Sequence, residues 1–295
     1  GPISSSIKLP NGDTWKNLIT EGTSKVAETT QEFRDNFYYN FLDPQVQALH
    51  RSLNVYQQWD DHEVVNNWYP GEQLLDDDRY KVKSVSLLAE RSRAALLQCN
   101  PIAVNPLDER QLYRKVNHGP MLDVFFLDMR SYRGPNSRNR QTKASPETAL
   151  LGDPQLQWLK QSLALSKATW KIISSDMPIG MMVTEWQSDI AENAANGDGP
   201  ALGRELEVAE LLAFIAKNNI PNVHFITADV HYCASHHYQP KLAQFKNFKP
   251  FWEFVSGPLH AGTFGPNKLD NTFGPQLVFK GIPDDLAPNS APSEN

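Results

Sequence analysis

Acidic, imidazole and carboxamide side chains are concentrated between residues 57 and 68, which read Gln-Gln-Trp-Asp-Asp-His-Glu-Val-Val-Asn-Asn-Trp. The neighbouring carboxylates of Asp60 and Asp61 repel each other unless a cation or a shared proton lies between them. Carboxylate, carboxamide and imidazole groups are ligands that hard or borderline metal ions accept. The pattern favours a metal site in which His62 and Glu63 act as acid/base or outer groups. A solvated acidic loop or a helix N-cap is the alternative that these residues leave open.

A second cluster lies in the run Thr-Ala-Asp-Val-His-Tyr that begins at residue 227. Asp229 and His231 are two residues apart, so at the end of an extended strand both side chains would point toward one cation. Such a pair is common and is a weak signal by itself, but the first acidic cluster strengthens it. His236 and His237 follow as further candidates, and because neighbouring strand residues alternate faces, we expect at least one of them to be exposed.

Both clusters are expected at the carboxyl ends of strands, which we predict at 54–59 and 222–227. This edge is where open α/β folds bind ligands. A strand predicted at 170–175 ends at Asp176, which we interpret as a turn-capping residue rather than a ligand.

Another predicted strand, at 121–127, is followed by Asp-Met-Arg-Ser-Tyr-Arg. Guanidinium is the side chain best suited to bidentate phosphate recognition. We therefore predict that Arg133 anchors an anionic substrate. For Arg130, a salt bridge to Asp128 that fixes the turn is an equally good interpretation.

The remaining chain alternates helical and strand patterns, which predicts an α/β fold with a mixed central sheet flanked by helices. A helix pair within 28–51 is expected to divide at Pro44. A loop at 256–267 contains His260, which would either contact phosphate or pack within the loop. Further elements are expected as follows: helices at 76–98, 153–165 and 204–218, strands at 112–116 and 251–255, and an irregular, variable loop at 185–200.

The composition describes a globular protein with ample core. The chain has 295 residues, of which 40% are hydrophobic and 21% charged, enough for one large domain or at most two. A net charge of −6 and the lack of a basic patch argue against a nucleic-acid partner. No apolar run is long enough for a membrane span. An anionic substrate gains nothing from the overall charge, so metals and arginines would have to attract it.

Several of these motifs resemble, in order, those of the PhoD-like alkaline phosphatases, which are related to the calcineurin-like metallophosphoesterases. The resembling strings are Trp-Asp-Asp-His-Glu with Asn-Asn-Trp, Leu-Asp-x-Arg-x-Tyr-Arg, Ser-Asp-Met-Pro-Ile-Gly, and Asp-x-His preceded by Ala228 where the family has glycine. The resemblance covers nearly the whole chain. It implies a metallophosphoesterase-like αββα sandwich with a core at 1–282 and a polar tail or truncated continuation at 283–295.

The resemblance also implies hydrolysis of a small phosphoester by a metal-activated water. The implied metal ligands are Asp61, Asn67, Asp229 and His231, which the hypothesis requires to converge. His62 would assist the leaving group, and Arg133, His260 and Asn67 would contact the substrate. The implied metals are Fe³⁺ with Ca²⁺, with Zn²⁺ as an alternative, and the implied location is extracellular or periplasmic.

In the family, Gly-Pro-Ile often directly follows a metal-binding Gly-Asp…Tyr-Ala-Asp block. We therefore expect a chain truncated at both ends that lacks this block. The alternative to an enzyme is a metallophosphatase-fold fragment that binds an ion or anion without turnover. Mono- or diester preference and oligomeric state stay open.

Overall fold

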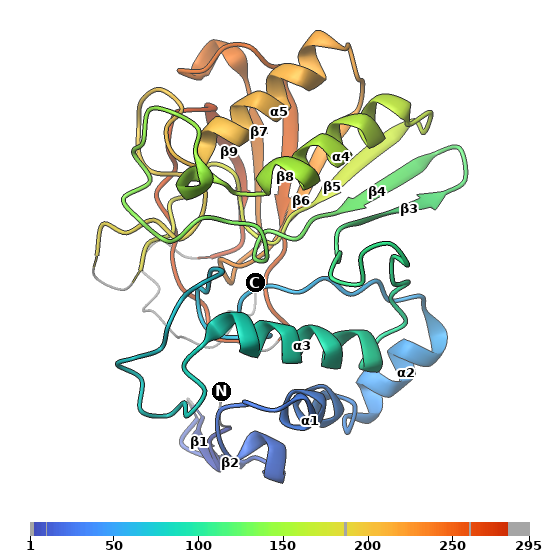
Figure 1. Ribbon diagram of the computed structural model, residues 1–295, viewed down its shortest axis with the longest axis vertical. Coiled ribbons are helices and arrows are strands. Elements are labelled where there is room, and N and C mark those ends of the chain that lie inside the picture. The colour runs from blue at the N-terminus through green and yellow to red at the C-terminus, as the bar shows by residue number, and fades with distance from the viewer. Residues whose placement is uncertain (1–2, 10, 186–187, 260, 283–295) are drawn as a thin grey trace. The chain divides into compact units, whose positions relative to one another are not determined.

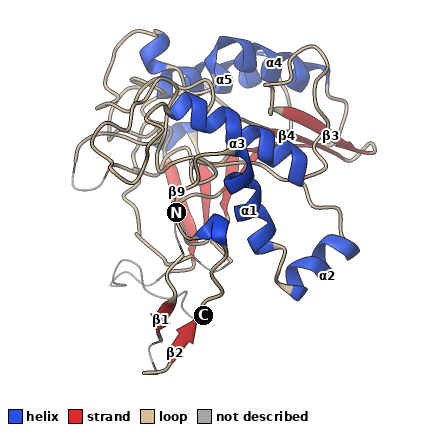
Figure 2. Cartoon of the chain, turned by 60° about the horizontal axis from the view of Figure 1, so that its bottom comes forward, coloured by secondary structure: helices blue, strands red, loops and turns tan. Residues whose placement is uncertain are grey.

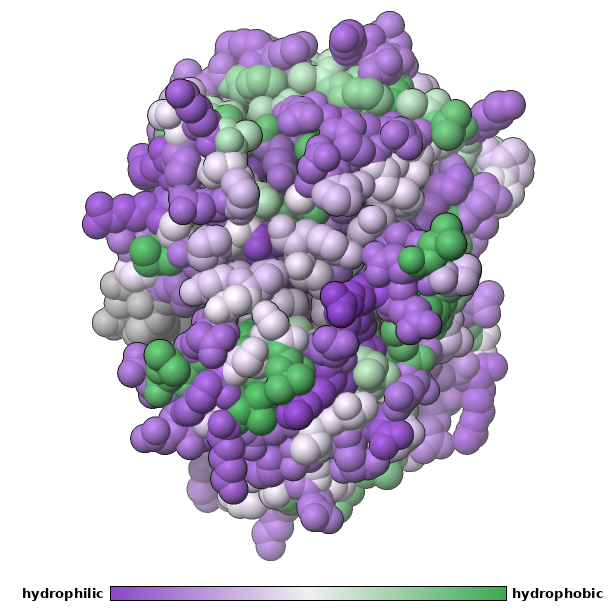
Figure 3. Space-filling view, viewed as in Figure 1, coloured by the Kyte–Doolittle hydropathy of each residue, from purple (hydrophilic) through white to green (hydrophobic). Residues whose placement is uncertain are grey.

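The computed structural model describes residues 3–9, 11–185, 188–259 and 261–282. The chain forms two compact units, Gly1–Gln111 and Leu112–Asn295. No helix in these described ranges is long and apolar enough to span a membrane. The face in Figure 3 carries its apolar residues in small groups among polar ones.

The first unit is built on three helices whose ends the sequence encodes. They are α1 (Thr30–Asn40), α2 (Pro44–Ser52) and α3 (Val85–Cys99), and α1 packs against α3. Thr29 and Glu32 form a capping box at the start of α1. Asp43 caps α2, which Pro44 opens as predicted. A short 3₁₀ helix (Glu21–Thr23) and the antiparallel pair β1 (Ser6–Lys8) and β2 (Thr14–Lys16) precede them.

Two predictions for the first unit are wrong. The helix expected from residue 76 begins only at Val85, where Ser84 caps it. Residues 54–60 form neither helix nor strand. Aromatic and β-branched content favours a strand only where a partner completes the ladder, so the acidic cluster follows irregular backbone instead of a strand end.

The second unit contains a seven-stranded mixed sheet in the order β3-β4-β5-β6-β8-β7-β9. The neighbours β4, β5, β6 and β8 are parallel, whereas β3, β7 and β9 pair antiparallel. The strands are β3 (Arg114–His118), β4 (Leu122–Phe126), β5 (Trp170–Ser174), β6 (Val223–Thr227), β7 (Ala234–Tyr238), β8 (Phe251–Val255) and β9 (Pro275–Lys280). The α/β class with a mixed sheet is confirmed.

Helices α4 (Gly152–Leu165) and α5 (Glu205–Lys217) lie side by side over one face of this sheet (Figure 1, Figure 2). Single-turn 3₁₀ helices lie at Pro146–Thr148 and Pro240–Leu242. Leucines of both helices pack with Phe125, Ile173 and Phe225 of the strands into the main core. The predicted helices of the second unit and the strands β4, β5, β6 and β8 are confirmed. Each strand is rich in apolar and aromatic residues, which is the pattern that predicted it.

Replacing Leu159 with alanine is expected to lower the free energy of unfolding by about 2–5 kcal/mol, because it leaves a cavity in the core. The Leu159 side chain is fully buried in α4. Leu165, on the same helix, is 79% exposed, so Leu165→Ala should change stability by less than about 0.5 kcal/mol. Urea unfolding of both variants checks this; similar losses at both positions would contradict the packing described here.

Candidate active site

In the first unit, the acidic cluster is folded into consecutive turns that Asp61 holds. Its carbonyl accepts hydrogen bonds from the backbone of Val64 (2.8 Å) and Val65 (3.0 Å). Its side chain is buried, and Oδ2 accepts the backbone N–H of Asn67 at 2.6 Å. Asn67 has a left-handed backbone with φ of 53°. The Asp61 carboxylate therefore holds the backbone of Asn67, the other proposed ligand of this segment.

Two tryptophans fix the ends of this segment. Trp59 and Trp68 are both buried, and their rings meet edge to face with centroids 5.5 Å apart. Such aromatic pairs contribute beyond the area they bury. The packed tryptophans thus anchor the polar residues between them, although this segment contains no helix or strand.

His62 and Glu63 differ in their surroundings. The His62 side chain is exposed, and its Nε2 lies 4.0 Å from Asp61 Oδ1. Burial raises the pKa of Glu63, whose Oε2 accepts the Asp60 backbone N–H at 2.7 Å. Both residues line a cavity of about 180 Å³, together with aromatic side chains that include Phe33 and Tyr80. An exposed imidazole beside a cavity is suited to proton transfer.

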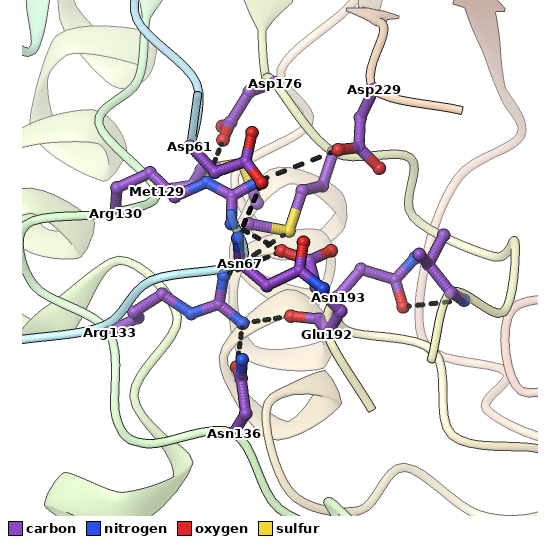
Figure 4. A network of polar contacts seen from close by, with 12 residues as sticks. Asp61, Asn67, Met129, Arg130, Arg133, Asn136, Asp176, Glu192, Asn193 and Asp229 are labelled. Atoms are coloured by element: carbon purple, nitrogen blue, oxygen red, sulfur yellow. Dashed lines mark hydrogen bonds and ion pairs between the residues drawn. The ribbon is translucent and has the colours of Figure 1, made fainter. Parts of the chain in front are cut away.

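In the second unit, a buried guanidinium that follows β4 connects acidic groups that follow β5 and β6. Arg130, after β4, contacts Asp176 after β5 (Nε to Oδ2, 3.0 Å) and Asp229 after β6 (Nη2 to Oδ1, 3.7 Å). It also forms an ion pair with Glu192 (Figure 4). Arg130 is completely buried. The carboxyl ends of parallel strands meet at one edge of the sheet, so residues distant in sequence share one counter-ion.

Arg133 belongs to the same network through Glu192 (Figure 4). Its Nη1 lies 3.1 Å from Glu192 Oε1, and Nη2 donates to the Glu192 carbonyl and to Asn136 Oδ1, the latter at 2.8 Å. Burial lowers the pKa of Arg133. These contacts are those of a structural ion pair, and substrate anchoring by Arg133 stays a prediction.

Glu192 was missed by the sequence analysis. The segment 185–200 was expected to be an irregular, variable loop and not part of the core. Its described residues form no helix or strand, as expected, but residues 191–197 are all buried, so the placement outside the core is wrong. Burial opposes ionisation of Glu192, yet the charges of Arg130 and Arg133 lower its pKa. Arg204 closes the segment by donating to the carbonyls of residues 191–193. The available signal in the sequence was Glu192 itself, a single acid within a run rich in alanine and asparagine.

Asp229 and His231 lie just beyond β6 in an unusual backbone. Both have left-handed conformations, with φ of 67° and 60°, so the extended geometry expected for the pair is wrong. Among residues with a side chain, mainly Asn, Asp and His adopt this region, and such backbone is frequent at functional sites.

The His231 ring is oriented by a hydrogen bond and by the Phe264 ring, whose centroid lies 4.7 Å away. Its Nδ1 lies 2.6 Å from the carbonyl oxygen of Gly262. Because a carbonyl only accepts, Nδ1 carries the proton and Nε2 keeps its lone pair. This is the arrangement in which a metal-binding histidine donates its other N–H to a carbonyl.

Comparisons with known proteins show the family to which the chain belongs. The model of the family described as PhoD-like phosphatase matches residues 4–286. The chain belongs to the PhoD-like phosphatase family. Alkaline phosphatase D of Bacillus subtilis (strain 168) is 26% identical to this PhoD-like chain over 267 residues, which cover 87% of the chain and 44% of the relative. The chain therefore spans less than half the length of that relative.

A solved structure described as that of PhoD superposes with a TM-score of 0.60 at 24% identity. The superposition covers 82% of this PhoD-like chain and 47% of the other. It confirms the fold class.

The metal-binding and substrate-binding roles expected from the sequence of this PhoD-like chain stay predictions. In the described ranges, no group of three or more His, Cys, Asp or Glu side chains is placed to hold a metal. Asp229 and His231 nevertheless offer carboxylate and imidazole donors held by Arg130 and Gly262, which fits a cation. His260 lies outside the described residues. Asp128 caps its turn by accepting the N–H groups of Arg130 and Ser131.

A buried pair of acids, Glu205 with Asp270, gives this PhoD-like chain a pH-dependent stability. Burial, followed by the charge of Asp270, raises the pKa of Glu205 from 4.5 to about 9. The folded state therefore keeps a proton that the unfolded chain releases above its ordinary pKa. This contribution to stability is complete below pH 4.5 and is lost as the pH rises through about 9.

Between pH 6 and 8, the free energy of unfolding should fall by up to about 1.4 kcal/mol per pH unit because of this proton. Glu205→Gln keeps an uncharged amide in place, so its slope should be flatter. Glu147→Gln, at an exposed position, serves as control with the parent slope. Equal slopes for the parent and Glu205→Gln, measured by urea unfolding across this pH range, would contradict the assignment.

Proposed function

We propose that this chain is the hydrolytic core of a metal-dependent phosphoesterase. Membership of the PhoD-like phosphatase family supports hydrolysis of a phosphoester. The observation that carries the metal dependence is the Asp229 and His231 pair on left-handed backbone, in which Arg130 holds the Asp229 carboxylate and the Gly262 carbonyl holds His231 Nδ1, leaving Nε2 for a cation. Strained backbone is maintained where the surrounding structure holds it for a function.

The proposed ligands are Asp61 and Asn67 in the first unit and Asp229 and His231 in the second. Oxygen donors favour Ca²⁺, whereas imidazole suits iron or zinc, and we propose Fe³⁺ with Ca²⁺, with Zn²⁺ as the alternative. When bound, such cations neutralise phosphoryl charge and lower the pKa of water. Arg130 fixes the Asp229 carboxylate by charge, and the Gly262 carbonyl fixes the His231 tautomer.

The proposed substrate contacts are Arg133, Asn67 and His260, and His62 is the proposed proton donor to the leaving alcohol. His62 is exposed and lines the cavity of about 180 Å³ in the first unit. That cavity offers room for a leaving group next to the imidazole. An exported protein is part of the proposal, and cell fractionation of its source tests it.

Removing metal is expected to abolish turnover. Hydrolysis of p-nitrophenyl phosphate and its bis ester should be lost after chelation and should return when Ca²⁺ and iron are added together. The ratio of the two rates reports mono- or diester preference. Hydrolysis that survives thorough chelation would contradict metal dependence. A chain that binds no metal and turns over neither ester would instead be a non-catalytic domain of this fold.

A further inference from the structure

The loop that follows β8 makes two contacts with the proposed ligand His231. Residues 261–267 read Ala-Gly-Thr-Phe-Gly-Pro-Asn and lie outside the helices and strands. The Gly262 carbonyl oxygen lies 2.6 Å from His231 Nδ1. The Phe264 ring lies against the imidazole, with centroids 4.7 Å apart and planes inclined at 49°. A hydrogen bond and a ring contact from one short segment therefore hold the same side chain.

The two contacts restrict the imidazole ring in different ways. The outer torsion of a histidine side chain is broad and roughly two-fold, so a half-turn that exchanges the places of Nδ1 and Cδ2 is otherwise allowed. The Gly262 carbonyl favours the orientation in which the Nδ1 proton points toward it. The Phe264 ring packs against the imidazole and opposes its rotation. Only an ordered ring keeps the lone pair of Nε2 at a constant position.

The loop is itself fixed to the chain next to the proposed ligand. The backbone N–H of Asn267 donates to the hydroxyl of the buried Tyr232 at 2.9 Å. Gly265 has a φ of +100°, and a Cβ added to it would lie 2.7 Å from Tyr232 Cε1, so glycine is required for this close approach. Phe264 packs against the apolar cluster that contains Tyr232. Tyr232 therefore fixes the position of the loop, and with it the position of the Phe264 ring.

Hydrogen bonds on either side of these contacts also hold the loop. Before it, the backbone N–H of Gly257 donates to Cys233 Sγ at 3.3 Å. At its end, Asn267 Nδ2 donates to the Met182 carbonyl at 2.9 Å. These contacts reach two segments, one just beyond His231 and one after β5. Because the loop is held by contacts that do not involve the imidazole, it can orient the imidazole rather than follow its movements.

We propose that Phe264 is a positioning residue that keeps the His231 imidazole in the orientation in which Nδ1 donates to Gly262 and Nε2 keeps its lone pair for a cation. The inference rests on the proposed function, in which His231 is a metal ligand. A phenyl ring offers no donor atom to a cation, so the effect of Phe264 on metal binding passes through the His231 ring. Replacing a group that orients a metal ligand typically costs about 10–100-fold in metal affinity.

Phe264→Leu keeps an apolar side chain but removes the ring that packs on the imidazole. Calorimetric titration with Zn²⁺, a cation that imidazole suits, should show an affinity about tenfold or more below that of the parent. Phe264→Tyr keeps the ring and should bind Zn²⁺ as the parent does. Phe245→Leu is the matched control, because Phe245 is also half-buried but packs against the main core. It should lower the free energy of unfolding about as much as Phe264→Leu and leave Zn²⁺ affinity unchanged.

A second readout needs no metal. Nitrogen-15 spectra of the neutral His231 ring in the metal-free chain report which ring nitrogen carries the proton. The parent, Phe264→Tyr and Phe245→Leu should show one tautomer, with the proton on Nδ1, and Phe264→Leu a mixture of both.

A single unchanged tautomer in Phe264→Leu would overturn the proposal. So would Zn²⁺ affinity that falls equally in Phe245→Leu, or that Phe264→Tyr fails to retain. If the parent bound no Zn²⁺, His231 would not be the ligand that the proposed function requires, whereas the tautomer spectra would still decide whether Phe264 orders its ring.

Discussion

Replacing Arg130 with methionine is expected to lower the free energy of unfolding by about 3–5 kcal/mol, which is the typical cost of breaking a buried ion pair from one side. Arg130 is completely buried among Asp176, Glu192 and Asp229. Without Arg130, the carboxylates of Glu192 and Asp176 remain buried but no longer have its positive charge beside them. Arg130→Lys should recover part of the loss, because a lysine keeps the charge but cannot contact three acids with a planar fork.

The matched control is the exposed pair of Arg138 and Asp189. Its atoms are close, with Arg138 Nε 2.7 Å from Asp189 Oδ2, but the two side chains are 72% and 65% exposed. Arg138→Met should therefore cost less than about 1 kcal/mol. Urea unfolding measures both variants. If Arg130→Met were no more destabilised than Arg138→Met, burial would not make this network important for stability.

Replacing Asp229 with asparagine is expected to lower phosphatase turnover at least about 100-fold. Loss of a group that merely supports a metal ligand costs about 10–100-fold, and Asp229 is proposed as a ligand itself. The change keeps the shape of the side chain and removes its charge. Bound-metal content, measured with turnover of p-nitrophenyl phosphate, should fall in parallel. Asp61→Asn in the first unit should behave in the same way.

Asp176→Asn separates the loss of a ligand from the loss of an ion pair. Asp176 contacts the same guanidinium, Arg130 Nε, at 3.0 Å, but is not a proposed ligand. The Asp176→Asn variant should lower the free energy of unfolding as much as Asp229→Asn does, but it should retain more bound metal. Asp189→Asn, at the surface, should leave both quantities unchanged. Equal metal loss in Asp176→Asn and Asp229→Asn would show that Asp229 acts only through the ion-pair network.

Local sequence determined those elements whose signals are complete within a few residues. The capping box of Thr29 with Glu32 and the Asp43-Pro44 start of α2 act within one helical turn. The apolar strand β8 was predicted at its observed bounds, Phe251–Val255. By contrast, β7 reads Ala-Ser-His-His-Tyr and was not predicted. It is a strand because β8 and β9 pair with it on either side, and that pairing joins distant segments.

For the candidate site, the sequence by itself determined the chemical groups. Residue type and spacing indicated the acidic cluster at 60–63 and the pair Asp229 and His231, and the resemblance to the family implied Asp61 and Asn67 as ligands. Only the tertiary structure decided how charges are paired, because Arg130 meets Asp176 and Glu192 across 46 and 62 residues of chain. A local pattern carries no information about such contacts, which form when strand ends meet at one sheet edge. Burial then decides how much these contacts matter for stability, because a buried carboxylate without the Arg130 guanidinium would be an unpaired charge.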